Sequence, residues 1–341
     1  MSCYITGYGA ALPDRVVTNA QLAPMLGVKP DWIEANSGVR ERRWVEAHQA
    51  TSDLAVAAVR DALNDATSVE QVDYLIGCTL SPDYQVPGIT PLVQRKLDGC
   101  RGIPAIDLRA GCAAILYALQ LARALIESQA ARTVVCFGAE AQSKGLDLQP
   151  RSAELSMLFG DGAGAIVISS EPKLIDKARD SLVRIDDVLI ETDGRFAEEL
   201  IVRAPGTANG ARWFDEEQLA AGLHRGSMQG RRVILQAVRK LAEAAVRITE
   251  RNEISLDQID VVIPHQANAN LLRSLAKRLS ISEERIVSNL ERFGNTSSAS
   301  AFLALWQANR ESRFHAGSYA LILAFGAGFT WGSALCRVCD D

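Results

Sequence analysis

Apolar residues follow two recurring patterns along the chain. Short runs rich in Val and Ile, typical of buried strands, occur at 74–80, 133–140, 165–170, 260–266, 319–328 and 333–338. Between these runs, apolar residues recur with the 3.6-residue period of helices, at 51–66, 113–128, 231–249, 268–279 and 298–309. Strands that alternate with helices in this way indicate an α/β protein with largely parallel sheets.

The order of these elements is repeated. Each half runs helix, strand, helix, a loop that opens a long helix, strand, Gly-rich turn and final strand. The loop is "AIDLRAGC" at 105–112 in the first half and "ERFGNTSSAS" at 291–300 in the second. A repeat of this length predicts two similar α/β halves that face each other, with the functional site at their seam.

The repeat divides the chain into three parts. Residues 1–170 form an N-terminal half and residues 221–341 a C-terminal half. Residues 171–220 have no obvious counterpart in the repeat, so we expect a loop-rich insertion that covers the site. Under the repeat, Cys112 and Asn295 occupy matching places, each at the start of the same helix of its half.

Composition and charge narrow the class of protein. The chain has 341 residues, of which 48% are hydrophobic and 23% charged, which describes a globular protein with a large core. Its formal net charge of −5 gives no reason to expect binding to nucleic acid. The N-terminal residues have no basic start and no long apolar segment, so we expect neither a signal peptide nor a membrane span.

The cysteines indicate a redox environment. Their number, seven, is odd, and several lie in strand-like runs, which favours free thiols in a reducing cytoplasm over a disulfide framework. Cys336 and Cys339 form a CxxC pair without a second pair or histidines nearby, so we expect no metal site there.

Candidate chemistry appears in the order Cys, His, Asn and glycine turn. Cys112 lies where a polar lead-in becomes an apolar helix, and the helix dipole is expected to lower the pKa of its thiol. His265 follows a hydrophobic strand, where α/β folds place ligand-binding groups, and Asn295 precedes a helix. Taken singly, each has a structural alternative: a buried core cysteine, a strand-capping histidine and a helix N-cap.

Two glycine-rich segments differ in what they predict. The turn "FGAGF" at 325–329 lets backbone N–H groups line an anion pocket, which suits stabilisation of an oxyanion. "GDGAGA" at 160–165 precedes a strand, with no helix behind it and no acidic ribose partner at the right distance. A dinucleotide-binding loop needs that helix, so we expect no nucleotide cofactor.

With these motifs, the chain resembles the β-ketoacyl-acyl-carrier-protein synthase III family of the thiolase superfamily. The likeness covers nearly the whole chain, least clearly 171–230, and is carried by "ITGYGAALPDRVVTN", "GVRERR", "DLRAGC", "FGDGAGA", "PHQAN", "GNTSSAS" and "FGAGFTWGSAL". The resemblance implies a thiolase-like fold, with two duplicated α/β halves in five αβαβα layers, and a homodimer.

The resemblance also implies a mechanism. Cys112 takes an acyl group from an acyl-CoA as a thioester, with the oxyanion held by the backbone N–H groups of Cys112 and Ala327. The family often has glycine where Ala327 stands. His265 and Asn295 then bind the carbonyl of a malonyl thioester and stabilise the enolate that forms as CO₂ leaves. CoA thioesters are the substrates, and no metal or redox cofactor is required.

Residues outside the catalytic set match the family in part. The resemblance implies that Trp32 stacks on the CoA adenine and that Arg151 contacts the nucleotide. It also implies that Lys277 and Arg278, together with Arg273, dock an acidic acyl carrier protein, although exposed basic residues on a helix need no partner.

At other positions the sequence departs from the pattern of the family. Asn36 and Asn270 stand where the family usually has arginines, and Arg109 precedes the cysteine in "DLRAGC". The delivery surface therefore differs from that of members that initiate fatty acids. The text around Arg109 is more similar to specialised branches that make quinolone-type signals and other secondary metabolites, so both pathways remain open.

Three other functions compete with condensation. Some relatives transfer the acyl group to an alcohol or amine, with the histidine as general base and no CO₂ released. A papain-like hydrolase also uses Cys, His and Asn in this order, but its cysteine lies in a CGSCW-like context instead of "AGCAA". A non-catalytic partner subunit that shapes a cavity typically lacks the nucleophile.

Overall fold

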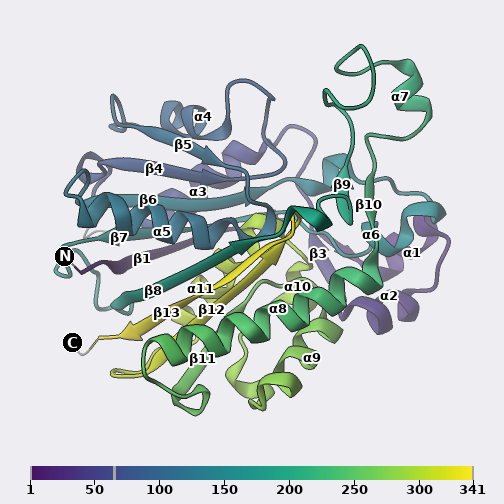
Figure 1. Cartoon of the computed structure of the whole chain (residues 1–341). Coiled ribbons are helices and arrows are strands. Elements are labelled where there is room, and N and C mark those ends of the chain that lie inside the picture. The colour runs from purple at the N-terminus through teal and green to yellow at the C-terminus, as the bar shows by residue number, and fades with distance from the viewer. Residues whose placement is uncertain (1, 64–66, 340–341) are drawn as a thin grey trace.

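The computed structural model describes residues 2–63 and 67–339 (Figure 1). Within them, one sheet has the strand order β11-β12-β13-β8-β1-β7-β6-β4-β5. In chain order these strands are β1 (Tyr4–Ala11), β4 (Tyr74–Cys78), β5 (Ala105–Leu108), β6 (Thr133–Glu140), β7 (Gly162–Ser169), β8 (Val183–Thr192), β11 (Ile259–Pro264), β12 (Tyr319–Gly326) and β13 (Thr330–Val338).

The sheet joins two similar sets of strands. β1 and β8 meet through only two residue pairs, Tyr4 with Arg184 and Ile5 with Val183. On one side of this junction β4 pairs with β6 in parallel and β6 with β7 antiparallel. On the other side β11 pairs with β12 in parallel and β12 with β13 antiparallel, which confirms the predicted repeat.

Each set of strands forms one layer of the fold, and helices form the other three layers. α5 (Ala114–Glu127) and α11 (Ser300–Arg310) lie between the two sets and contact strands of both. The outer faces are covered by α3 (Thr51–Ala62) and α4 (Ile89–Lys96) on the first set, and by α8 (Gly230–Arg251) and α9 (Ala269–Leu279) on the second (Figure 1). The αβαβα fold class expected from the sequence is thus confirmed.

β6 shows why its sequence reads as a continuous apolar run. Val134 and Cys136 belong to the core between the two sets of strands, with α5 and α11. Val135 and Phe137 belong to the outer core, with α3 and α4. A strand covered by helices on both faces has no solvent side, so its sequence does not alternate.

Shorter elements complete the chain. They are β2 (Val16–Thr18), α1 (Asn19–Leu26), α2 (Pro30–Ser37), β3 (Glu41–Arg43), α6 (Ala153–Ser156), β9 (Leu200–Val202), α7 (Glu216–Ala220), β10 (Gly226–Met228) and α10 (Leu290–Phe293). The segment that carries α7 projects beyond the layers (Figure 1). Of the helix expected over 51–66, α3 covers Thr51–Ala62, and 64–66 lie outside the described residues.

Two expectations for local structure were wrong. "GDGAGA" is not wholly a turn, because β7 already begins at Gly162. A Cβ at Gly164 would lie 2.7 Å from the Cβ of Phe302, so glycine there allows α11 to pack directly on the strand.

The segment 171–220 is not loop-rich throughout, since β8 lies at the centre of the sheet and pairs with both β1 and β13. The pair Asp186–Asp187 interrupts its apolar alternation, and the register with β13 shifts between Leu335 and Cys336. Such an irregularity hides a strand from periodicity. The three-part division of the chain stays a prediction, with β8 assigned to the second set.

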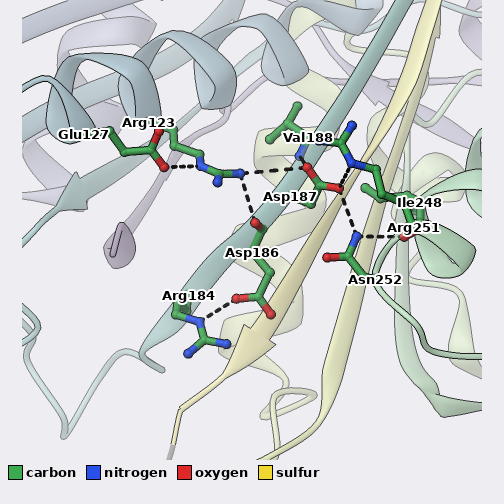
Figure 2. A network of polar contacts seen from close by, with 9 residues as sticks. All are labelled: Arg123, Glu127, Arg184, Asp186, Asp187, Val188, Ile248, Arg251 and Asn252. Carbon is green, nitrogen blue, oxygen red and sulfur yellow. Dashed lines mark hydrogen bonds and ion pairs between the residues drawn. The ribbon is translucent and has the colours of Figure 1, made fainter. Parts of the chain in front are cut away.

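A polar cluster fixes Asp187 in this strand (Figure 2). Its Oδ2 accepts a hydrogen bond from Asn252 Nδ2 at 2.9 Å and lies 3.2 Å from Arg251 Nε, both at the end of α8. Arg123 of α5 donates to the Asp186 carbonyl at 2.9 Å and lies 3.9 Å from Asp187 Oδ1. The cluster therefore ties α5 of the first half to α8 of the second.

Candidate active site

A cavity of about 460 Å³ opens at the seam between the two halves. Cys112, His265 and Asn295 all line it, although they lie far apart in the sequence. The other lining residues are predominantly apolar and come from both halves: Trp32, Asn36, Glu154, Met157, Leu158, Phe159, Leu200, Met228, Gly230, Arg231, Val233, Ile234, Ala237, Leu241, Ala267, Asn268, Leu271, Phe325 and Gly326. A concave, mostly apolar pocket with a few polar groups is the usual form of a small-molecule site.

Cys112 lies in a 3₁₀ turn, Gly111–Ala113, that leads directly into α5. Its Sγ lies 3.6 Å from Ser297 Oγ. Burial raises the pKa of the Cys112 thiol to about 12, with Ser297 lowering it and Glu140 raising it. The expected lowering of this pKa at the helix start is therefore wrong, because loss of solvation outweighs the nearby donors.

The glycine turn packs against Cys112. A Cβ at Gly326 would lie 2.7 Å from the Cys112 backbone nitrogen, and a Cβ at Gly111 would lie 3.2 Å from the Ala327 nitrogen. Only glycine permits such a close approach of two backbones. The turn that carries Ala327 consequently packs directly on the turn that carries Cys112, and Cys112 and Gly326 both line the cavity.

His265 follows β11 directly. Its backbone N–H donates to the Leu323 carbonyl at 2.7 Å, which holds the residue beside β12. The ring Nδ1 lies 2.5 Å from Ser300 Oγ. Burial lowers the pKa of His265 to about 3, so the imidazole is neutral at physiological pH.

Asn295 is held by the chain segment beside it. Its backbone N–H donates to the Leu158 carbonyl at 2.8 Å, and its carbonyl accepts from Gly160 at 3.2 Å. The side-chain Oδ1 accepts from the Ser297 backbone N–H at 2.8 Å. Because this bond occupies the oxygen, the Nδ2 group is the end of the amide that can donate to a ligand.

The structure corrects the predicted equivalence of Cys112 and Asn295. The turn before α5 is Gly111–Ala113, and the turn before α11 is Ser297–Ala299. Since both turns run directly into their helices, Cys112 corresponds to Ser298, and Asn295 corresponds to Arg109. The internal repeat of the sequence therefore placed Asn295 near the right helix start, but three residues out of register with Cys112.

Trp32 and Arg151 share a second cavity of about 460 Å³, which also includes Glu154 and Met228. Trp32, Glu154 and Met228 line the first cavity as well, so the two adjoin. Arg151 is held by Asp147, with Nε 2.9 Å from Oδ2 and Nη2 3.3 Å from Oδ1. The two residues expected to contact CoA thus lie together beside the candidate active site.

The basic residues expected to dock a carrier protein lie on α9. Arg273, Lys277 and Arg278 are exposed, whereas the leucines of the opposite face are buried. The helix begins at the cavity, because Asn268 and Leu271 line it.

The two departures from the family pattern, Asn36 and Asn270, lie against each other. The Asn36 carbonyl accepts a hydrogen bond from Asn270 Nδ2 at 3.3 Å. It also accepts from Asn268 Nδ2 at 2.8 Å, so this part of α2 is tied to the start of α9.

Neither a metal centre nor a membrane span is found in the described part of the chain. No group of three or more His, Cys, Asp or Glu residues there is placed to hold a metal ion. None of the described helices is long and apolar enough to cross a bilayer. All seven cysteines lie within the described ranges and are thiols.

Several site residues were missed from the sequence. Ser297 and Ser300 contact Cys112 and His265, and their only signal was the run of serines after Asn295. The wall supplied by α8 between Gly230 and Leu241 was also missed, since its residues read as an ordinary amphipathic helix. Leu158 and Phe159, just before the "GDGAGA" segment, also line the cavity.

Comparison with known proteins identifies the family of the chain. A family model described as 3-oxoacyl-[acyl-carrier-protein (ACP)] synthase III matches residues 106–184, and a model of the C terminal of the same synthase matches residues 249–338. A β-ketoacyl-[acyl-carrier-protein] synthase III of Rhodospirillum rubrum is 39% identical over 336 residues, which are 98% of each chain. One of Nitratidesulfovibrio vulgaris is 36% identical over 337 residues, again 98% of each chain.

A solved structure extends the likeness to three dimensions. The crystal structure of 3-oxoacyl-[acyl-carrier-protein] synthase III from Aquifex aeolicus VF5 superposes with a TM-score of 0.85 at 32% identity, covering 98% of this chain and 99% of the other. Identity at this level over the full length, together with the shared fold, shows that the chain belongs to the β-ketoacyl-[acyl-carrier-protein] synthase III family.

Proposed function

We propose that the chain catalyses the decarboxylative condensation of an acyl thioester with a malonyl thioester, which makes it an acyltransferase. The observation that carries the proposal is the meeting of Cys112, His265 and Asn295 in one mostly apolar cavity. The packing of the glycine turn on Cys112 supports it, because it brings backbone N–H groups to the place where an oxyanion forms.

In the first half-reaction, Cys112 Sγ attacks the carbonyl of an acyl-CoA. The S–C bond to CoA breaks, a new S–C bond forms to Cys112, and the thiol proton leaves with CoA as its free thiol. The backbone N–H groups of Cys112 and Ala327 stabilise the tetrahedral oxyanion. The apolar cavity lining takes the acyl chain.

In the second half-reaction, His265 Nε2–H and Asn295 Nδ2–H donate to the thioester carbonyl of the malonyl group. Loss of CO₂ leaves an enolate whose negative oxygen these two donors stabilise. The carbanion attacks the acyl-Cys112 carbonyl, and the Cys112 thiolate leaves as the β-ketoacyl thioester forms. A neutral His265 suits this role, because a neutral imidazole carries one N–H group that can donate to the carbonyl oxygen.

Delivery of substrates uses the surface around the cavity. Trp32 and Arg151 bind the CoA nucleotide in the second cavity. The exposed basic face of α9, with Arg273, Lys277 and Arg278, docks an acidic carrier protein that brings the malonyl group.

Homodimer formation in the cytoplasm completes the proposal. β5 is the last strand of the sheet, and Ile106 on it is 38% exposed. The loop between β4 and α4 exposes Tyr84 and Val86 as well. An uncovered strand edge with apolar neighbours suits pairing with a second copy of the chain.

Acyl transfer to an alcohol or amine is not favoured. That reaction needs His265 as a general base near neutral pH. A histidine whose pKa burial lowers to about 3 is a weak base.

The test combines two measurements on one set of variants. Incubation with a panel of acyl-CoAs is expected to add one acyl group to the intact mass of the protein, and Cys112→Ala is expected to abolish it. CO₂ release from malonyl-CoA or a malonyl carrier protein is expected to fall at least about 100-fold in His265→Ala and Asn295→Ala. Unchanged CO₂ release in both variants would refute condensation, and acylation that persists in Cys112→Ala would refute the nucleophile.

A further inference from the structure

We infer that Ser300 is a positioning residue that holds His265 in the tautomer with its proton on Nε2. The inference rests on the proposed function for its catalytic consequence, because His265 must present a donor to the malonyl carbonyl. The tautomer itself is a property of the unliganded protein. It is therefore open to measurement without substrate.

Ser300 is the first residue of α11 and is completely buried. Its Oγ lies 2.5 Å from His265 Nδ1 and accepts a hydrogen bond from the Gln266 backbone N–H at 3.2 Å. The cap position of the helix, Ala299, has no side-chain hydrogen bond. The Ser300 hydroxyl is thus directed to the end of β11 instead of capping its own helix.

A count of hydrogens distinguishes the two tautomers. A serine hydroxyl has one proton to donate and two lone pairs to accept with. If Ser300 donates to Nδ1, the Gln266 N–H, the serine proton and the Nδ1 lone pair are all satisfied. The ring proton must then sit on Nε2.

The other tautomer leaves a group unsatisfied. With the proton on Nδ1, Ser300 Oγ would accept from both His265 and Gln266. Its own buried proton would have no acceptor among the residues that the structure describes. The cost of an unmade hydrogen bond at a buried group is enough to bias the tautomer equilibrium about 5- to 150-fold.

The tautomer of His265 determines whether Nε2 attracts or repels the carbonyl oxygen of the substrate. Nε2–H donates to the carbonyl and then to the negative enolate oxygen, which strengthens the bond as CO₂ leaves. A bare Nε2 would instead direct a lone pair at that oxygen. Ser300 therefore acts on the reaction without contacting the substrate.

The neighbouring Ser298 provides a matched control. It is buried on the same helix start, but its Oγ donates to Glu140 Oε1 at 2.6 Å. Ser298→Ala removes a buried hydroxyl and loosens the same turn without touching His265. Ser300→Thr keeps the hydroxyl and is the conservative variant.

The decisive experiment is ¹⁵N NMR of protein labelled at histidine, which distinguishes protonated from bare ring nitrogens. The chain has four histidines, and the signals of His265 are those missing in His265→Gln. We expect wild-type His265 to be protonated on Nε2, with Ser298→Ala unchanged and Ser300→Ala shifted toward Nδ1. A wild-type proton on Nδ1, or an unshifted Ser300→Ala, would overturn the inference. The wild-type spectrum is decisive even if Ser300→Ala does not fold.

Kinetics separate this inference from the proposed function. We expect Ser300→Ala to lower kcat for CO₂ release about 10- to 100-fold, with acylation of Cys112 within about 3-fold and activity restored in Ser300→Thr. A shifted tautomer with unchanged CO₂ release would support the positioning role and contradict the role proposed for His265. Equal losses in both half-reactions, without a tautomer shift, would show that Ser300 is only structural.

Discussion

The two central helices, α5 and α11, begin with the same backbone but carry different chemistry. Each is preceded by a 3₁₀ turn whose first residue has a left-handed conformation, Gly111 at φ 56° and Ser297 at φ 50°. The repeat therefore extends to single residues. The next position holds Cys112 in one half and Ser298 in the other.

The difference follows from what lies opposite each turn. Gly111 faces the Ala327 backbone nitrogen, 3.2 Å from where its Cβ would be, and a side chain there would push the glycine turn away. Ser297 has room for a side chain, and its hydroxyl lies 3.6 Å from Cys112 Sγ. A left-handed non-glycine residue costs of order 1–3 kcal/mol, which is typical of functional sites. Duplication thus directs two helix starts at one seam, and local packing places the proposed nucleophile at one of them and the neighbouring hydroxyls at the other.

The largest effect is expected from closing the contact at the first helix start. A Cβ in Gly326→Ala would lie 2.7 Å from the Cys112 nitrogen and 3.0 Å from that of Ala113, so the backbone must shift. Loss of aligned oxyanion donors is expected to slow acylation of Cys112 about 100- to 1000-fold. Stopped-flow release of CoA measures the rate.

Gly145→Ala is the matched control, because nothing lies within 4 Å of its added Cβ. It is expected to acylate at the wild-type rate. If Gly326→Ala acylates equally fast, the glycine turn does not serve as an oxyanion site.

A smaller effect is expected from the second helix start. With the Cys112 pKa at about 12, the thiolate fraction rises about tenfold for each pH unit below that value. The rate of alkylation by iodoacetamide should therefore rise about tenfold per pH unit throughout the range from pH 6 to pH 9. Ser297→Ala removes a hydrogen bond that lowers this pKa, which should slow alkylation a further 3- to 10-fold, roughly one hydrogen bond. Peptide mapping assigns the label to Cys112.

A plateau in the alkylation rate below pH 8 would show that the thiol ionises more easily than its burial implies. Faster alkylation in Ser297→Ala would show that this hydroxyl stabilises the thiol rather than the thiolate.

The smallest effect on the site is expected from the far end of α5. Asp187→Asn keeps the shape of the side chain but weakens the charged contacts with Arg251 and Arg123 (Figure 2). We expect unfolding in urea to require about 1–3 kcal/mol less, while acylation of Cys112 is unchanged. A large loss of acylation would show that the nucleophile depends on how both ends of its helix are held.

The fold was largely predictable from the sequence, because each half repeats the same order of apolar strands and amphipathic helices. β8 escaped prediction because Asp186 and Asp187 break its alternation, and the burial of Asp187 depends on contacts with α5 and α8. The start of β7 escaped because glycines there serve close packing with α11 instead of a turn.

The sequence by itself determined the α/β repeat, the family, and the presence of a cysteine and an asparagine near helix starts and a histidine after a strand. These features follow from local periodicity and from short motifs, both of which can be recognised in a single sequence. The tertiary structure alone decided the state of those groups. Burial raises the pKa of Cys112 and lowers that of His265, and Ser300 reaches His265 across 35 positions of sequence. Solvation and hydrogen-bond partners depend on residues that only folding brings together, so no local pattern contains them.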